Sequence, residues 1–95
     1  MDQQPKQIQI KIADSELKGS YANLMRVSHT KEEFILDFAN VLPQEGGIVT
    51  ARIITSPGHL KRIIQALQGN LKRYEENFGE IEIAKEPNSQ IGFKP

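Results

Sequence analysis

Seven apolar side chains between positions 60 and 78 recur with the spacing of an α-helix, and this pattern constrains the fold more than any other. Ser56 is a good N-cap, since its hydroxyl can accept a hydrogen bond from a free N–H of the first turn. Pro57 suits the first helical position, and Gly79 suits the left-handed conformation that ends a helix. The sequence therefore predicts one long amphipathic helix over 57–78, whose apolar stripe is Leu60, Ile63, Ile64, Leu67, Leu71, Tyr74 and Phe78.

Four segments upstream of this helix have the pattern of β-strands. Residues 7–12 alternate isoleucine with polar residues, which is typical of a half-buried strand. Segments 21–28, 33–41 and 48–55 follow, and the short turn at 29–32 predicts a hairpin between the first two of these. The expected fold is α+β: a four-stranded, mainly antiparallel sheet followed by one long C-terminal amphipathic helix.

The expected organisation is a single domain over 7–84, because a chain of 95 residues lies near the small end of those that fold alone. Residues 1–6 are polar and are expected to form a flexible N-terminal segment. Residues 85–95 hold little apolar surface and several chain-breaking residues, so we expect a flexible C-terminal tail. Within this tail, Ile91 and Phe93 form a small apolar island that is suited to docking on a partner or on the chain's own sheet.

The strands over 33–41 and 48–55 are apolar on both faces, which is unusual for a sheet that is open to water on one side. The apolar stripe of the predicted helix is expected to form the core by covering one of these faces, and one helix cannot cover both. Either the sheet curls on itself or a second copy of the chain packs against it, and pairing of identical chains is the commoner solution. The sequence therefore predicts a homo-oligomer, with a dimer as the first expectation.

Charge balance and cysteine content narrow the classes of function. The chain has 12 Lys plus Arg and 12 Asp plus Glu, which lowers the expectation of nucleic-acid binding without removing it. It has no cysteine, which excludes a disulfide framework and a cysteine-ligated zinc site. No apolar run approaches the length of a membrane helix, and the first residues lack the profile of a signal peptide. We expect a cytoplasmic protein without a membrane partner.

The residue types of catalytic and metal sites occur without the spacing that such sites need. His29 and His59 are the two histidines, and neither has further ligands at matched spacing. Ser28 and Asp37 would complete a catalytic triad with His29, but adjacent residues of a strand point to opposite faces. The double glycine at 46–47 lacks the lysine and serine of a phosphate-binding loop. We expect no catalytic, cofactor-binding or metal-binding residue, and no enzymatic activity.

A group of basic residues lies on the predicted solvent face of the helix. A solvated charged face is the simpler interpretation. The alternative is a patch for an anionic partner, in which lysine and arginine contact phosphates or acidic side chains. Glu75 and Glu76 follow at once and limit the length of such a patch. The basic residues are Lys61, Arg62, Lys72 and Arg73.

A charged pair is also predicted within the sheet. Arg52 lies on an otherwise apolar face of its strand, so burial of that face would require a carboxylate partner for the guanidinium. Asp37 on the neighbouring strand is the natural candidate. A buried pair of this kind more often specifies structure than chemistry.

The most distinctive segments of the chain are Tyr21–Leu24, Val27–Thr30, Glu33–Phe38, Ala51–Arg62, Asn70–Leu71, Tyr74–Glu75 and Phe78–Ile81. Together they resemble an uncharacterised family of short prokaryotic proteins that is known only as a domain of unknown function. The resemblance covers about 7–81, and the tail over 87–93 is similar to that of some members. It carries over no catalytic residue. In some bacteria, genes of this family lie beside those of the large RNA polymerase subunits, so the resemblance implies a link to transcription.

The leading expectation is a non-enzymatic, cytoplasmic interaction protein that acts as a homo-oligomer. One alternative is a transcription-associated accessory protein that contacts RNA polymerase or nucleic acid through the basic helix face. Another is a chaperone-like binder of unfolded chains, which two-sided apolar strands would suit. Salt separates these hypotheses, because only binding through the basic residues weakens steeply as salt rises. The candidate partner-binding residues are Lys61, Arg62, Lys72, Arg73, Ile91 and Phe93.

Overall fold

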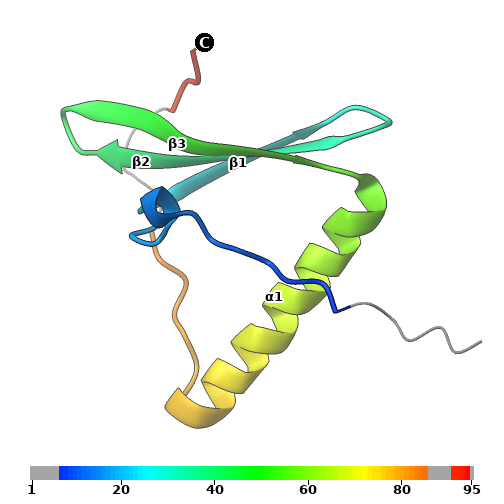
Figure 1. Ribbon diagram of the computed structural model, residues 1–95. Helices are drawn as coiled ribbons and strands as arrows, with labels where there is room; N and C mark the ends of the chain where they lie inside the picture. Colours follow the sequence, from blue (N-terminus) through cyan, green and yellow to red (C-terminus); the bar gives the residue numbers. More distant parts are fainter. Residues whose placement is uncertain (1–6, 86–90, 95) are drawn as a thin grey trace, which may run out of the picture.

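The computed structural model describes residues 7–85 and 91–94, and its centre is an antiparallel sheet in the order β1-β2-β3. The α+β class is confirmed, with three strands in place of the expected four (Figure 1). The elements are a short 3₁₀ turn, η1 (Asp14–Glu16), then β1 (Leu24–His29), β2 (Phe34–Leu42), β3 (Gly46–Thr55) and the helix α1 (Pro57–Phe78).

The predicted hairpin between β1 and β2 is confirmed, and Thr30 shapes its turn. The Thr30 N–H donates to the Glu33 carbonyl at 3.0 Å. The Thr30 hydroxyl oxygen accepts from the backbone N–H groups of Glu32 and Glu33 at 3.1 and 3.2 Å. This local bonding places His29 opposite Phe34 and so fixes the register of the whole pair.

The turn between β2 and β3 is tighter than the expected strand bounds imply, because β3 begins at Gly46 and not at residue 48. Gln44 and Gly46 adopt positive φ angles of 69° and 90°, and the Glu45 N–H donates to the Leu42 carbonyl at 3.2 Å. A Cβ atom on Gly47 would lie 2.9 Å from a methyl carbon of Val41. Glycine at 47 therefore allows the close approach of the two strands.

A β-bulge interrupts the ladder between β2 and β3. Phe38 pairs with Ala51 but Ala39 pairs with Val49, so Thr50 is an extra residue. Its hydroxyl donates to the Phe38 carbonyl at 3.2 Å. Val49 consequently lies on the opposite face from Ala51, whereas strict alternation predicts one face for both.

The expected fourth strand, over 7–12, is wrong for the single chain. Within the described residues, this segment makes no backbone hydrogen bond to the sheet, and Ile10 is 92% exposed. Alternation decides which side chains a strand would bury, but a strand also needs a neighbour for its backbone groups. The segment has the side-chain pattern of a strand without that neighbour.

The next strand is shorter than expected, because a side chain replaces the backbone ladder at its start. The Asn23 side-chain amide donates to the Val41 carbonyl at 2.9 Å. Its oxygen accepts from the Val41 N–H at 2.8 Å. Asn23 thus satisfies both backbone groups of Val41, and β1 begins one residue later, at Leu24.

The helix has the predicted bounds and the predicted caps. The Ser56 hydroxyl accepts from the His59 N–H at 3.2 Å, and Pro57 occupies the first helical position. Gly79 has the expected positive φ, at 97°, but its ψ of 168° is extended and not that of a left-handed helical residue; its N–H donates to the Glu75 carbonyl at 2.9 Å. These signals lie within a few residues of each end, which is why sequence alone locates them.

The expectation that α1 covers one face of the sheet is wrong for the single chain. No residue of α1 is buried, and Leu67 and Phe78 are 65% and 76% exposed. The helix leaves the end of β3 at a steep angle to the sheet (Figure 1). Ser56 alone joins the two elements, and one linking residue gives the chain little freedom to fold the helix back across the strands.

The buried residues of the described chain all lie on β2, the central strand. They are Leu36, Asp37 and Ala39. The sheet face that carries Leu36 also exposes Met25, Val27 and Ile53. Figure 1 shows α1 on one side of the sheet and residues 91–94 on the other. The single chain therefore leaves most of its apolar surface in contact with water.

Candidate functional site

Three charged residues meet across the middle of the sheet, one from each strand. The register places Asp37 of β2 between Arg26 of β1 and Arg52 of β3. Arg52 donates to both carboxylate oxygens of Asp37, at 2.7 and 3.0 Å. Arg26 donates to one of them at 2.9 Å. The predicted pair of Arg52 and Asp37 is confirmed.

Sequence reasoning missed Arg26, although a signal for it was present. In a hairpin whose turn is centred between Thr30 and Glu33, residues that pair have numbers that add to a constant. The pairing of His29 with Phe34 therefore places Arg26 opposite Asp37. A hairpin register, once assumed, would have revealed the second arginine.

The carboxylate of Asp37 is the most enclosed charge in the described chain. Its side chain is 1% exposed, whereas those of Arg26 and Arg52 are 41% and 56% exposed. Hydrogen bonds from Arg52 and Arg26 outweigh desolvation and lower the pKa of Asp37 from 3.8 to about 2. The same contact raises the pKa of Arg52. Two guanidinium groups against one carboxylate leave this face with one excess positive charge.

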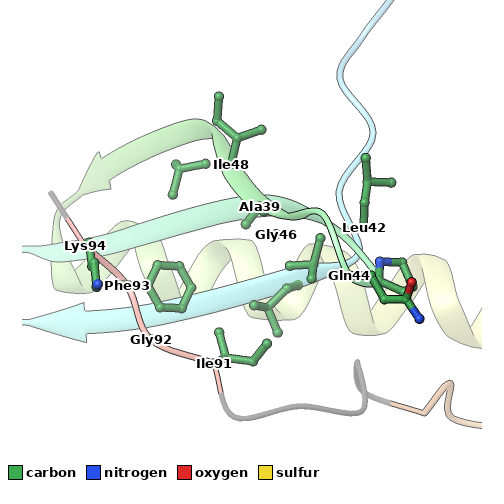
Figure 2. Close-up of a pocket in the computed structure, with 14 residues that line it drawn as sticks. Ala39, Leu42, Gln44, Gly46, Ile48, Ile91, Gly92, Phe93 and Lys94 are labelled. Carbon is green, nitrogen blue, oxygen red and sulfur yellow. The ribbon is translucent and has the colours of Figure 1, made fainter.

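Residues 91–94, near the end of the tail, lie beside this charged cluster. The Phe93 ring sits over the Arg26 guanidinium, with its centroid 4.2 Å from Cζ, which is a cation–π contact. A pocket of about 980 Å³ opens next to it, between residues 91–94 and the strand residues Leu24, Ala39 and Val49. In Figure 2, residues 91–94 run along one side of this pocket and the strands form the other.

The structure separates the two groups of predicted binding residues. Ile91 and Phe93 line the pocket on the sheet. The basic residues Lys61, Arg62, Lys72 and Arg73 are exposed on α1, and no residue of α1 lines that pocket. The candidate sites are therefore two: a groove on the sheet and a surface on the helix.

We expect Phe93→Ala to lower the free energy of unfolding by about 1 kcal/mol or less, because one partly exposed cation–π contact is lost. Lys94→Ala serves as the neighbouring control and should leave stability unchanged. Urea denaturation measures both. A loss for Phe93→Ala well above this range would show that the tail is part of the core.

The expected mobility of the tail stays a prediction, which hydrogen exchange can test. Residues 86–90 and 95 of the tail lie outside the described residues. The expected flexible N-terminal segment, residues 1–6, also lies outside them.

The residues of the apparent triad are not assembled. His29 packs against Phe34, with ring centroids 5.3 Å apart, and its position on β1 places it on the face opposite Asp37. Ser28 is adjacent to His29 on the strand and points the other way. This arrangement provides no path for proton transfer between the serine and the histidine.

In residues 7–85 and 91–94, no three His, Cys, Asp or Glu side chains gather as a group that could hold a metal ion. Over the same ranges, no helix combines the length and apolar character of a membrane span. That neither histidine binds a metal stays a prediction. Elemental analysis of the purified protein is expected to find less than stoichiometric metal. Stoichiometric metal that disappears in His29→Ala or His59→Ala would contradict it.

Comparison with known proteins identifies a family but no activity. No curated protein and no solved structure matches the chain. A family model described as a protein of unknown function (DUF3467) matches residues 1–83, which is most of the chain. This match agrees with the resemblance noted from the sequence. The chain therefore belongs to the DUF3467 family of proteins of unknown function.

Proposed function

We propose that the protein is a non-enzymatic, cytoplasmic interaction protein whose working form is a homodimer. The observation that carries this proposal is the apolar stripe of α1, which is regular over the whole helix and has no buried member in the single chain. A contiguous apolar surface that is exposed along a whole helix is typical of an interface. A second copy is the occupant that we favour, because pairing of identical chains is the commonest form of assembly.

The exposed area supports the same proposal. A compact monomer of 10.7 kDa exposes about 5500 Å². This chain exposes 9496 Å². The excess is several times the ~800 Å² that each partner buries in a standard interface. A dimer therefore has apolar surface available to bury, as on α1, where Leu67 and Phe78 are exposed.

Light scattering across a dilution series tests the proposal. We expect a mass near twice that of the chain at micromolar concentration. A strict monomer at high concentration would overturn the proposal.

A second candidate function rests on the basic side of α1. Arg62, Lys72 and Arg73 lie opposite the apolar stripe, so they would stay exposed when the stripe is covered. Within the described residues, the ion pairs all involve Asp37, which leaves these cations without a carboxylate partner. An acidic partner, such as RNA or an acidic surface of RNA polymerase, would fit this face.

We expect binding of a single-stranded RNA oligonucleotide to weaken about twentyfold between 50 and 200 mM salt if three phosphates are neutralised. Fluorescence polarisation measures the affinity at each salt concentration. A variant with Arg62, Lys72 and Arg73 changed to glutamine should lose both the binding and the salt dependence. Binding that is insensitive to salt would instead favour apolar contacts with unfolded chains and would contradict this candidate.

A further inference from the structure

The apolar stripe of α1 follows the seven-residue repeat of a helix that packs lengthwise on another helix. Six of its residues are separated in turn by four, three, four, three and four positions. A period of 3.5 residues is the signature of a left-handed pair of helices. α1 is the one α-helix of the described chain, so no other described segment can supply the second helix. The six residues are Leu60, Ile64, Leu67, Leu71, Tyr74 and Phe78.

We infer that α1 pairs with α1 of a second copy, and that the two helices run antiparallel. This inference rests on the proposed homodimer and specifies its interface. The choice of direction follows from the charges that flank the stripe, from the sizes of the side chains that meet, and from where the sheet is attached.

The flanking charges are complementary only in the antiparallel arrangement. Lys61, Gln68 and Glu75 lie at seven-residue intervals along one edge of the stripe. When the helices run antiparallel, this edge meets the same edge of the other helix. Lys61 of each copy then lies opposite Glu75 of the other, and the two Gln68 amides meet at the centre. A parallel pair would bring this edge against Ile63 and Asn70, with no opposite charge.

Glu75 is held in a suitable position within each chain. One of its carboxylate oxygens accepts a hydrogen bond from the Ile81 N–H at 2.9 Å. This contact ties the carboxylate to the segment that follows α1 and restricts its rotamers. The second oxygen makes no hydrogen bond within the described residues, so it can accept one from Lys61 of the other copy. Lys61 is exposed and has no ion-pair partner in the described chain.

Side-chain volumes favour the same direction. In the antiparallel register, Tyr74 faces Ile64, and Phe78 faces Leu60. Each large aromatic then meets a smaller aliphatic side chain, and the layers have similar volumes. In a parallel pair, Tyr74 and Phe78 would meet their own copies, while Leu60 would meet leucine. Uneven layers of this kind leave either strain or cavities.

The position of the sheet agrees with this register. The sheet is joined to the N-terminal end of α1, and the C-terminal end lies far from it (Figure 1). Phe78, at that far end, is the most exposed residue of the stripe. Six layers span about 27 Å at 1.5 Å per residue. An antiparallel partner would bring its own sheet end beside Phe78, whereas a parallel partner would leave Phe78 far from both sheets.

The absence of native cysteine allows a direct test by disulfide crosslinking. Purified Leu60→Cys and Phe78→Cys chains are mixed, allowed to exchange subunits, oxidised and separated on a non-reducing gel. We expect a crosslinked dimer from the mixture and little from either variant alone. Gln65→Cys, on the opposite side of the helix, serves as the control for random collisions. Crosslinking of each variant with itself would show a parallel pair and overturn the inference.

Charge reversal gives a second test that does not touch the apolar layers. Lys61→Glu alone is expected to weaken the dimer about tenfold. The introduced carboxylate would face Glu75 of the other copy, and the symmetric dimer contains this contact twice. Glu75→Lys alone should do the same, and the double variant should recover the original affinity to within about threefold. Lys72→Glu, on the outer side of α1, should have little effect. Analytical ultracentrifugation measures each dissociation constant.

These outcomes distinguish the inference from the proposed function. A dimer by light scattering that gives no crosslink in the mixture, and no rescue in the double charge variant, would overturn the helix pairing and leave the homodimer standing. The apolar face of the sheet would then be the interface. A chain that stays monomeric at all concentrations would overturn both.

Discussion

Replacing Leu67 with aspartate is expected to weaken self-association of the chain about a thousandfold. A central interface side chain contributes about 2 kcal/mol or more, and a symmetric dimer contains this position twice. The charge would also have to be desolvated whenever the stripe is covered. Light scattering across a dilution series should find a monomer at concentrations at which the unchanged protein is a dimer.

Gln65→Asp is the matched control for this change. It introduces the same charge two residues away, on the side of α1 opposite the stripe, and should leave the dimer intact. Circular dichroism should show a similar helix content for both variants. Retention of full dimer affinity by the Leu67→Asp variant would mean that the stripe is not the surface through which the chain associates.

Replacing Asp37 with asparagine is expected to lower the urea midpoint of unfolding at pH 7 by about 1 M or more. The change removes the only negative charge between Arg26 and Arg52 and leaves two guanidinium groups facing each other across β2. Asp14→Asn, at an exposed position on η1, is the control and should keep the original midpoint. A midpoint equal to that of the unchanged protein would contradict a stabilising role for the cluster.

Asp37 also makes the stability of the folded chain depend on pH. Its pKa is about 2 in the folded chain and near 3.8 when unfolded. Because the folded carboxyl holds its proton less tightly, its contribution is complete above pH 4 and is lost as the pH falls toward 2. Urea midpoints measured from pH 7 to pH 2 at one protein concentration should fall more steeply for the unchanged chain than for Asp37→Asn.

The parts of this fold that sequence predicts are those set by neighbouring residues. The bounds of α1 follow from Ser56, Pro57 and Gly79, which act within a turn of each helix end. The first hairpin follows from a turn that Thr30 stabilises through its own side chain. The charged pair of the sheet was predictable for a related reason, since Arg52 on an apolar face requires a carboxylate within reach.

The parts that sequence does not predict depend on distant partners. The alternation over 7–12 describes a strand, but only a neighbouring chain edge could complete it. The bulge at Thr50 changes which face Val49 occupies, and no local pattern marks it. The surface that the stripe of α1 contacts is not predictable either, because the spacing of apolar residues is the same whether the stripe faces its own sheet or another molecule.

The sheet is a meander in which each strand pairs with the next one along the chain, and this order has a kinetic consequence. Contacts between segments that are close in sequence form early, because little loop entropy opposes them. Hairpins form in about 1–10 µs. Burial of the helix stripe would instead wait for a collision with another molecule. Refolding would therefore show a fast phase whose rate is independent of protein concentration, followed by a slower phase whose rate rises with it.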